Sequence, residues 1–394
     1  MHTKLVIFGI TGDLSQRKLL PVISELVKTE VGKDLSIVGV SRREVEVVEF
    51  LEKQPELIDR TSIFTMDLAK SEDYERLRKH LLLGDDEQAL IYLAVPPGAA
   101  ADIVDMLGEA GMSAQNVKIL FEKPFGFDYT SADTFIKRTA RYFNESQLYR
   151  IDHYMAKELA LDIIKKRHDS ESHHREWGAH SISKVEIIAS ETLGVEDRAT
   201  FYEQTGALRD VVQGHLMQLL ALILMRVPAD SSSVDIPKLR LEALRQLQLA
   251  HPDQSARAQY ASYQAEVKNK GSLTESFAQV TLHSEDPHWQ GVPLVLKTGK
   301  KLANKRTAII VTYHDGTQDV FEEGAILREE RVPDAYERVL EQAILGQKEI
   351  FTTSDEVLES WRILAPIQEA WSMSSVPLIT YPDGATIDTV THQK

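Results

Sequence analysis

The feature that most constrains the fold is an alternation of two residue patterns over the first 150 residues. Short runs that are almost wholly apolar and β-branched are separated by longer segments with apolar residues at helical spacing. Buried parallel strands have the first pattern, and the helices that connect them have the second. This rhythm predicts a Rossmann-like, doubly wound sheet. The expected strands are 4–10, 35–40, 62–67, 89–95 and 117–123, and the expected helices are 17–29, 43–54, 71–82, 99–111 and 130–143.

The rhythm changes after residue 150, where strand candidates cluster between helices. Such clustering predicts an α+β domain with a largely antiparallel sheet. A chain of 394 residues is long enough for two domains, and we expect them at 1–150 and 151–394. The strand candidates are 183–191, 275–283, 291–299, 306–314 and 318–323, and the helix candidates are 206–225, 334–346 and 355–372.

Composition limits the possible functions. The formal net charge of -15 argues against a general nucleic-acid surface, although a pocket with a few cations still suits a small anion. The absence of cysteine excludes disulfides and cysteine-ligated metals. The apolar run 219–225 is too short to span a bilayer, and the N-terminal run is unlike a signal peptide. We therefore expect a cytoplasmic protein without a membrane partner.

Two glycines lie where the first expected strand ends and before the first expected helix. They are Gly9 and Gly12, in VIFGITGDLSQRKLLP. Glycine lets the backbone approach a pyrophosphate, and the helix N-terminus supplies N–H donors. Asp13 is a candidate helix cap. The spacing is Gly-x-x-Gly rather than the fuller fingerprint, so a plain turn is the alternative reading of these glycines alone.

The second expected strand ends in IVGVSRRE, which contains Arg42 and Arg43. An acid at this position holds the ribose 2′-OH of NAD, whereas an arginine accommodates the 2′-phosphate of NADP. Glu44 lies past the arginine pair. The residues favour NADP, and an exposed basic loop is the alternative.

The stretch YRIDHYMAKE (149–158) gathers an acid, an imidazole, a phenol and an amine. Asp152 is predicted to cap a helix on which His153 and Lys157 stack at i, i+4. A helix start with His, Tyr and Lys side chains suits a phosphate. An ordinary capped, solvated helix is equally compatible with the spacing.

A second polar pair lies in the apolar helix TGALRDVVQGHLMQLLALILM, which carries Asp210 and His215. A buried imidazole must be hydrogen-bonded or functional, and a carboxylate partner would make it a general base. A satisfied core histidine is the alternative. Lys123 follows the fifth expected strand, where α/β sheets bind ligands. The His-rich tract 167–180 matches no tetrahedral zinc pattern, so we expect a solvated loop and no metal site.

Together these motifs resemble the glucose-6-phosphate dehydrogenase family over nearly the whole chain. The signature RIDHY-xx-KE is highly specific to that family, and the other motifs follow in register. In chain order they are FGITGDLSQRKLLP, GVSRRE, LAVPP, FEKPFG, YRIDHYMAKE, the 191–218 block, GVPLVLKTGKKL, VPDAYERV and WRILAP.

The resemblance implies oxidation of glucose 6-phosphate at C1 to 6-phosphoglucono-lactone with NADP, at the entry to the pentose phosphate pathway. It implies that His215 is the base that accepts the C1 hydroxyl proton and that Asp152 is its carboxylate partner. The residues implied to hold the phosphate are His153, Tyr154 and Lys157. Those implied to bind or position the sugar are Lys123, Glu191, Asp210 and Lys300. Those implied to bind the cofactor are Gly9, Thr11, Gly12, Asp13, Leu14, Arg42 and Lys123.

The chain departs from the family pattern at three places, as a short and divergent member would. Ala156 stands where the family usually has Gly, and Gly214 where it usually has Asn. Between 324 and 332 the chain lacks a few dozen residues, including sheet strands, a sugar-contacting Gln and part of a second NADP site. The family implies a homo-oligomer, either a dimer or a tetramer. The same chemistry on another sugar phosphate and a weakly catalytic NADP-binding sensor are the alternatives.

Overall fold

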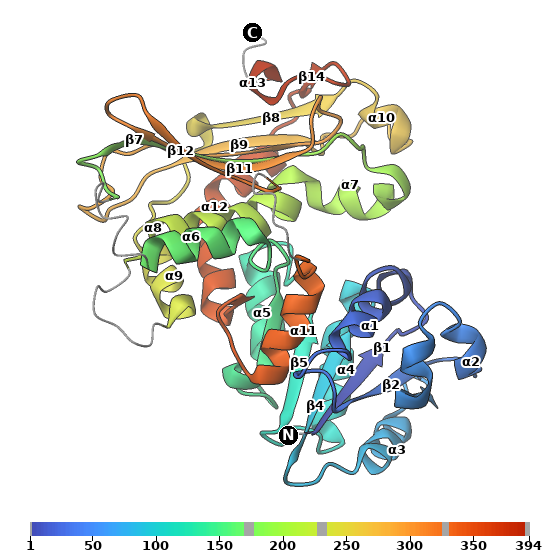
Figure 1. Cartoon of the computed structure of the whole chain (residues 1–394). Helices are drawn as coiled ribbons and strands as arrows, with labels where there is room; N and C mark the ends of the chain where they lie inside the picture. The colour runs from blue at the N-terminus through green and yellow to red at the C-terminus, as the bar shows by residue number, and fades with distance from the viewer. Residues whose placement is uncertain (1, 169–176, 227–234, 325–330, 391–394) are drawn as a thin grey trace. The chain divides into compact units, whose positions relative to one another are not determined.

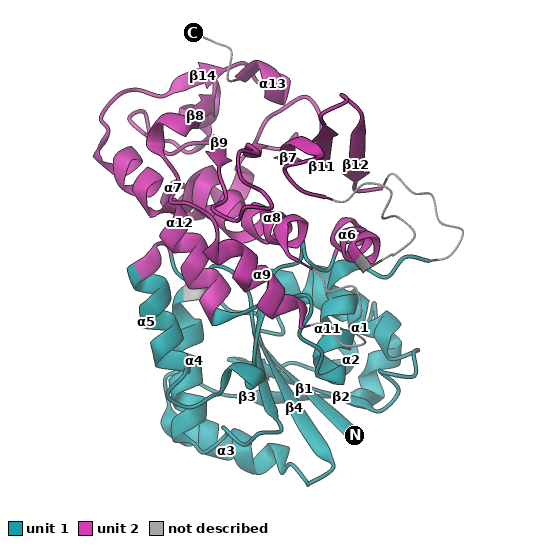
Figure 2. Cartoon of the chain, turned by 90° about the vertical axis from the view of Figure 1, so that its left-hand side faces the viewer, with its two compact units in different colours: residues 1–126, 130–156, 331–354 teal, residues 127–129, 157–330, 355–394 magenta. Residues whose placement is uncertain are grey.

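The chain folds into two compact units in a computed structural model (Figures 1 and 2), which describes residues 2–168, 177–226, 235–324 and 331–390. The first unit comprises residues 1–126, 130–156 and 331–354, and the second comprises 127–129, 157–330 and 355–394. The chain therefore leaves the first unit after Ala156 and returns to it at Arg331. The expected division at residue 150 treats the chain as two successive segments, so it does not include the return of residues 331–354 to the first unit.

The first unit is built on a seven-stranded sheet in the order β13-β6-β5-β4-β1-β2-β3. Every pairing is parallel except that of β13 with β6. This order confirms the predicted doubly wound sheet, and the central strands are buried, as their apolar runs require. The strands are β1 (His2–Phe8), β2 (Leu35–Ser41), β3 (Thr61–Thr65), β4 (Glu87–Leu93), β5 (Val117–Phe121), β6 (Leu148–Ile151) and β13 (Phe351–Thr352).

Helices cover both sides of this sheet, with α4 and α5 on one side and α1 and α11 on the other (Figure 2). The expected helix 43–54 is wrong, because only α2 (Val47–Phe50) is helical there. Two causes are visible: α2 buries none of its own side chains, and Pro55 disfavours helix at the residue before it. The other helical elements are η1 (Ser15–Leu19), α1 (Leu20–Leu26), η2 (Pro55–Arg60), α3 (Ser71–Leu81), α4 (Pro97–Glu109), α5 (Tyr129–Thr139), η3 (Glu145–Gln147) and α11 (Ala335–Leu345).

The second unit contains a seven-stranded sheet in the order β12-β11-β7-β10-β9-β8-β14. Only β7 with β10 and β8 with β14 pair in parallel, which confirms the predicted, largely antiparallel sheet. The sequence did not indicate β8 or β14. The strands are β7 (Ile182–Ser190), β8 (Ser255–Tyr260), β9 (Phe277–Leu282), β10 (Leu294–Gly299), β11 (Arg306–Tyr313), β12 (Gln318–Glu322) and β14 (Ile379–Tyr381).

A long helical run packs on one side of this sheet, together with α6 and α12 (Figure 1). Its length and hydropathy over 196–224 would suffice to cross a membrane, but 83% of its most apolar window is buried within the protein, as in a core helix. The run is also broken, because Gly206 has non-helical dihedrals. The helical elements of this unit are α6 (Glu158–His168), η5 (Glu196–Arg198), α7 (Ala199–Ala207), η6 (Leu208–Leu216), α8 (Met217–Leu224), α9 (Ile236–Arg245), η7 (Pro252–Gln254), α10 (Tyr263–Glu266), α12 (Ser354–Met373) and α13 (Ile387–Val390).

An ion pair between Arg240 and Glu356 joins α9 to α12, with 2.7 Å between Nε and Oε1 and no exposure of either side chain. Removing one partner of a buried ion pair costs about 3–5 kcal/mol, because the remaining charge loses its counter-ion. We predict that Glu356→Leu lowers the free energy of unfolding by this amount in urea denaturation. The double variant Arg240→Met/Glu356→Leu should lose less, since neither charge remains.

The neighbouring pair of Arg245 with Asp355 is the matched control, because its side chains are 55% and 57% exposed. Arg245→Gln should cost less than about 1 kcal/mol. Equal losses for Arg245→Gln and Glu356→Leu would contradict a special cost for the buried pair.

Candidate active site

The turn after β1 has the geometry expected of a dinucleotide-binding turn. Gly9 has a φ of +80°, and a Cβ there would lie 2.4 Å from the carbonyl oxygen of Ala94, so only glycine fits. The Gly12 N–H donates to the carbonyl of Gly9 at 2.9 Å, as does the hydroxyl of Ser15. The turn therefore closes on itself before the helix begins.

The predicted capping role of Asp13 is wrong. The helical conformation begins at Asp13 itself, and its carboxylate pairs with Nε of Arg17 at 2.6 Å. A carboxylate one turn before a guanidinium is a common ion pair on an exposed helix surface. Asp13 is therefore a residue of the first helical turn and not its cap. Thr11 lies in the turn before Gly12, whereas Leu14 follows Asp13 in the first helical turn.

Arg42 and Arg43 directly follow β2, and both are exposed. The Gly9 N–H donates to the carbonyl of Val40 at 3.2 Å, which ties the glycine turn to the end of β2. Within the described parts of the chain, neither guanidinium has a carboxylate partner. The arginines therefore lie at the same sheet edge as the glycine turn, and their contact with a 2′-phosphate stays a prediction.

Asp152 follows β6 at this edge, but it does not cap a helix, so that prediction is wrong. The helix α6 begins at Glu158, and residues 153–157 form turns. The buried carboxylate of Asp152 accepts the N–H of Tyr154 at 3.0 Å. This local bond competes with helix formation, so His153 and Lys157 do not stack on a helix.

Glu122, which sequence reasoning missed, lies between β5 and Lys123. The hydroxyl of Tyr92 donates to its carboxylate, and Tyr336 at the start of α11 donates to it as well. Burial raises the pKa of Glu122 to about 7, although the tyrosine bonds oppose the rise. The sequence signal for Glu122 was its place in FEKPFG, immediately before Lys123.

In the second unit, Glu191 and Lys300 follow β7 and β10, which are parallel neighbours. Their strand ends therefore meet, and Lys300 pairs with the carboxylate of Glu191. The Lys300 ammonium also lies 5.2 Å from the ring centroid of Tyr202 in α7. Burial raises the pKa of the Tyr202 phenol, and the charge of Asp210 raises it further. The structure thus groups Glu191, Lys300 and Asp210 around Tyr202.

Asp210 and His215 both lie in η6, which is a π-helix. A π-helix bonds residues five apart, so these two side chains approach the same face more closely than they would on an α-helix. His215 is buried, with 6% of its surface exposed. Short π-helical segments often mark functional sites.

Glu275, also missed by sequence reasoning, fixes where η6 starts. One carboxylate oxygen accepts the N–H of Leu208 at 2.9 Å, and its carbonyl accepts the N–H of Ala207 at 3.0 Å. Gly206 has a φ of +63°, and a Cβ there would lie 2.4 Å from the same oxygen. Glu275 therefore occupies the position where a regular helix would continue.

Lys157 pairs with Glu323, just after β12, at 2.9 Å from Nζ to Oε2. Asp152, His153 and Tyr154 belong to the first unit, whereas Lys157 and His215 belong to the second. The pairing of Asp152 with His215 and the shared phosphate site therefore stay predictions. Most of the His-rich tract, residues 169–176, lies outside the described residues.

The raised pKa of Glu122 gives stability that is present below its ordinary value of 4.5 and is lost as the pH rises through about 7. Glu122→Gln removes this titration. We predict that, between pH 5 and 8, the free energy of unfolding of the wild type falls by up to about 3 kcal/mol relative to that of Glu122→Gln. Urea denaturation at each pH measures both values.

Glu87→Gln is the control, since the Gly84 N–H and Lys4 hold the pKa of Glu87 below its ordinary value. Its difference from wild type should stay flat over the same pH range. A flat difference for Glu122→Gln would mean that Glu122 does not titrate near neutrality.

Comparison with known proteins assigns both halves of the chain to one family. The sequence model described as "Glucose-6-phosphate dehydrogenase, NAD binding domain" matches residues 6–161. The model of the C-terminal domain of the same family matches 167–331 and 324–389, with its break where the shortened segment was expected.

Similar proteins span nearly the whole chain. The glucose-6-phosphate 1-dehydrogenase of Dickeya dadantii is 29% identical over 450 positions, covering 94% of this chain and 91% of the relative. That of Bacillus subtilis is 29% identical, with coverages of 97% and 94%. Since these alignments are longer than this chain of 394 residues, the relatives carry segments that it lacks.

Two solved structures share the fold. The Mycobacterium avium glucose-6-phosphate 1-dehydrogenase is 26% identical with a TM-score of 0.84, covering 100% of this chain and 98% of that one. A glucose-6-phosphate dehydrogenase in complex with its substrate is 24% identical with a TM-score of 0.89, with coverages of 98% and 95%. Because the family models match both halves of the sequence, this chain belongs to the glucose-6-phosphate dehydrogenase family.

Proposed function

We propose that the protein oxidises glucose 6-phosphate at C1 with NADP, giving 6-phosphoglucono-lactone at the entry to the pentose phosphate pathway. The observation that carries the proposal is the common edge at which β1, β2, β5 and β6 end. Each strand is followed there by a group that the reaction needs: the glycine turn, Arg42, Lys123 and Asp152. The curated relatives named glucose-6-phosphate 1-dehydrogenase support the same activity.

The first unit fits NADP. The segment that contains Gly9, Thr11, Gly12, Asp13 and Leu14 would hold the pyrophosphate, since Gly9 and Gly12 carry no side chain that would block its close approach to the backbone. Arg42 would hold the 2′-phosphate, because a guanidinium binds such oxygens through paired N–H donors. When bound, NADP supplies the hydride acceptor. Lys123, at the end of β5, would contact both the cofactor and the sugar.

The catalytic base in this proposal is His215. Its buried imidazole accepts the proton of the C1 hydroxyl as the hydride leaves C1, and Asp152 orients the ring. Asp210, Glu191 and Lys300 hold the sugar hydroxyls. The grouping of those three residues around Tyr202 supports this assignment.

The sugar phosphate would bind to His153, Tyr154 and Lys157. Lys157 is already paired with Glu323, so the phosphate competes with that carboxylate for the ammonium. A dianion offers more charge than one carboxylate, which favours the exchange. An unphosphorylated sugar has no group that competes with Glu323 for the ammonium.

The proposal extends to location and assembly. We place the enzyme in the cytoplasm, which suits a chain of 394 residues without cysteine. We also propose a homo-oligomer, either a dimer or a tetramer. It is supported by the edge strand β12, whose Val320 is 49% exposed, because exposed sheet edges favour pairing between chains.

We predict that His215→Asn retains sugar-phosphate binding but lowers kcat about a hundredfold or more, because a positioned base contributes about that much. NADPH formation followed by absorbance measures the loss. His251→Asn, at an exposed histidine, should leave turnover unchanged. Near-normal turnover of folded His215→Asn would remove His215 from the base role.

We predict that Arg42→Ala raises the KM for NADP far more than the KM for NAD, because only NADP carries the 2′-phosphate. Steady-state kinetics with both cofactors measures the change. Arg76→Ala, at an exposed arginine paired with Asp73, should alter neither value. Equal effects of Arg42→Ala on the two cofactors would contradict the contact.

We predict that Lys157→Ala narrows the difference in kcat/KM between glucose 6-phosphate and glucose, because it removes a phosphate contact. Glu323→Gln should lower the KM for glucose 6-phosphate, since it releases Lys157 from its present partner. Glu322→Gln, one residue earlier, breaks only the pair with Arg306 and is the control. An equal loss for both sugars in Lys157→Ala would show that Lys157 does not read the phosphate.

A further inference from the structure

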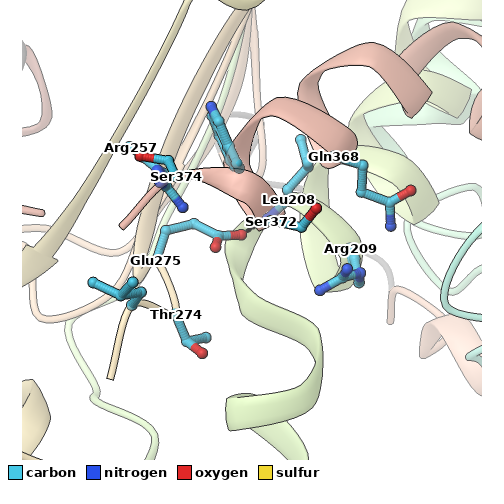
Figure 3. Close-up of a pocket in the computed structure, with 10 residues that line it drawn as sticks. Leu208, Arg209, Arg257, Thr274, Glu275, Gln368, Ser372 and Ser374 are labelled. Atoms are coloured by element: carbon cyan, nitrogen blue, oxygen red, sulfur yellow. Dashed lines mark hydrogen bonds between the residues drawn. The ribbon is translucent and has the colours of Figure 1, made fainter. Parts of the chain in front are cut away.

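A second site lies in the second unit, in a pocket of about 210 Å³ beside the start of η6 (Figure 3). Its lining comes from four segments that are distant in sequence: Leu208 and Arg209, Arg257 of β8, Leu273 to Glu275, and Gln368, Trp371, Ser372 and Ser374. None of the roles proposed above uses it. Its chemistry therefore requires a separate explanation.

Arg257 is the least satisfied cation of the pocket. Its guanidinium lies 5.4 Å from the ring centroid of Trp371 and is half-buried. Burial lowers the pKa of Arg257, since the charged form is partly desolvated. Across the described residues, no acceptor bonds this guanidinium and no carboxylate pairs with it at contact distance. Burying a charge without such a partner costs free energy, and a bound anion would offset that cost.

The other charges in the pocket define what kind of anion fits. The Nε–H of Arg209 already donates to the carbonyl of Phe127 at 3.0 Å, so fewer of its N–H groups are available to a ligand. One oxygen of Glu275 is used by the Leu208 N–H, and Figure 3 shows this side chain extending toward Leu208. Two guanidiniums against one carboxylate leave a formal surplus of one positive charge. Burial raises the pKa of Glu275, which leaves at least that positive surplus, so the pocket favours an anion.

The walls narrow the class of ligand further. Trp371 and Leu273 offer apolar surface, and Ser372 and Ser374 offer hydroxyls. The volume lies below the range of roughly 300–1,000 Å³ typical of drug-sized ligands, so the ligand is small. A carboxylate also matches a guanidinium through two parallel N–H···O bonds.

We propose that this pocket binds a small organic monocarboxylate, with its carboxylate on Arg257 and its apolar part against Trp371. The site differs from the proposed active site in residues and in ligand class. Because the pocket includes Leu208 and Arg209, an occupied site contacts the first turn of the segment that carries Asp210 and His215.

Calorimetric titration of the full chain tests the proposal with benzoate, with benzamide as a neutral molecule of the same shape, and with inorganic phosphate. Benzoate should bind, and benzamide and phosphate should bind at least about tenfold more weakly, because charged hydrogen bonds contribute that much. Absence of benzoate binding at millimolar concentration, or equal binding of benzamide, would overturn the proposal. Tighter binding of phosphate would overturn the monocarboxylate class.

Variants locate the bound benzoate. Arg257→Gln should weaken it at least about tenfold, and Arg257→Lys should weaken it less because the charge remains. Arg245→Gln, at an exposed arginine paired with Asp355, should have no effect. Lys157→Ala should also retain benzoate binding. If Lys157→Ala lost benzoate binding while Arg257→Gln kept it, the benzoate would be bound at the proposed active site and the proposal would be overturned. The wild-type comparison decides the outcome even if a variant fails to fold.

Discussion

Parallel pairing from β3 to β6 determines where the chemical groups of the first unit lie. Strands that run the same way end at the same edge, so segments that follow Phe8, Ser41, Phe121 and Ile151 meet there although they are far apart in the chain. The parallel arrangement requires long crossover connections, which the helices supply. A glycine turn, an arginine pair, a lysine and an aspartate thus become neighbours because of strand direction, before any side-chain contact is considered.

In the second unit, one pair of parallel strands within a largely antiparallel sheet brings two functional residues together in the same way. β7 and β10 are parallel neighbours, so Glu191 and Lys300 leave the sheet together and form an ion pair. The π-helical segment packs against this part of the sheet, and Glu275 fixes its first residue. The Glu275 carboxylate accepts the N–H of Leu208 and the Glu275 carbonyl accepts the N–H of Ala207, so this one residue determines the helical position of Asp210 and His215.

The sequence predicted the elements whose pattern is local. Apolar, β-branched runs such as KLVIF gave the buried strands correctly, whereas β8 and β14 carry polar residues and depend on their sheet neighbours. Asp152 was misassigned because an aspartate satisfies either a helix start or its own local turn, and only the tertiary structure decides between them. Glu122 and Glu275 were missed since their roles depend on Tyr92 and Leu208, respectively, which are distant in the chain. Sequence spacing records no such contacts.

Two of the lysines proposed to hold the substrate are already paired with carboxylates of the protein. Lys157 is paired with Glu323 and Lys300 with Glu191. A ligand therefore gains only the difference between its own contacts and those it replaces. That difference is small for a hydroxyl, which brings no charge, and larger for a phosphate dianion. Arg257 contrasts with both lysines, because no carboxylate among the described residues forms an ion pair with its guanidinium, so the anion proposed to bind there would displace none of them.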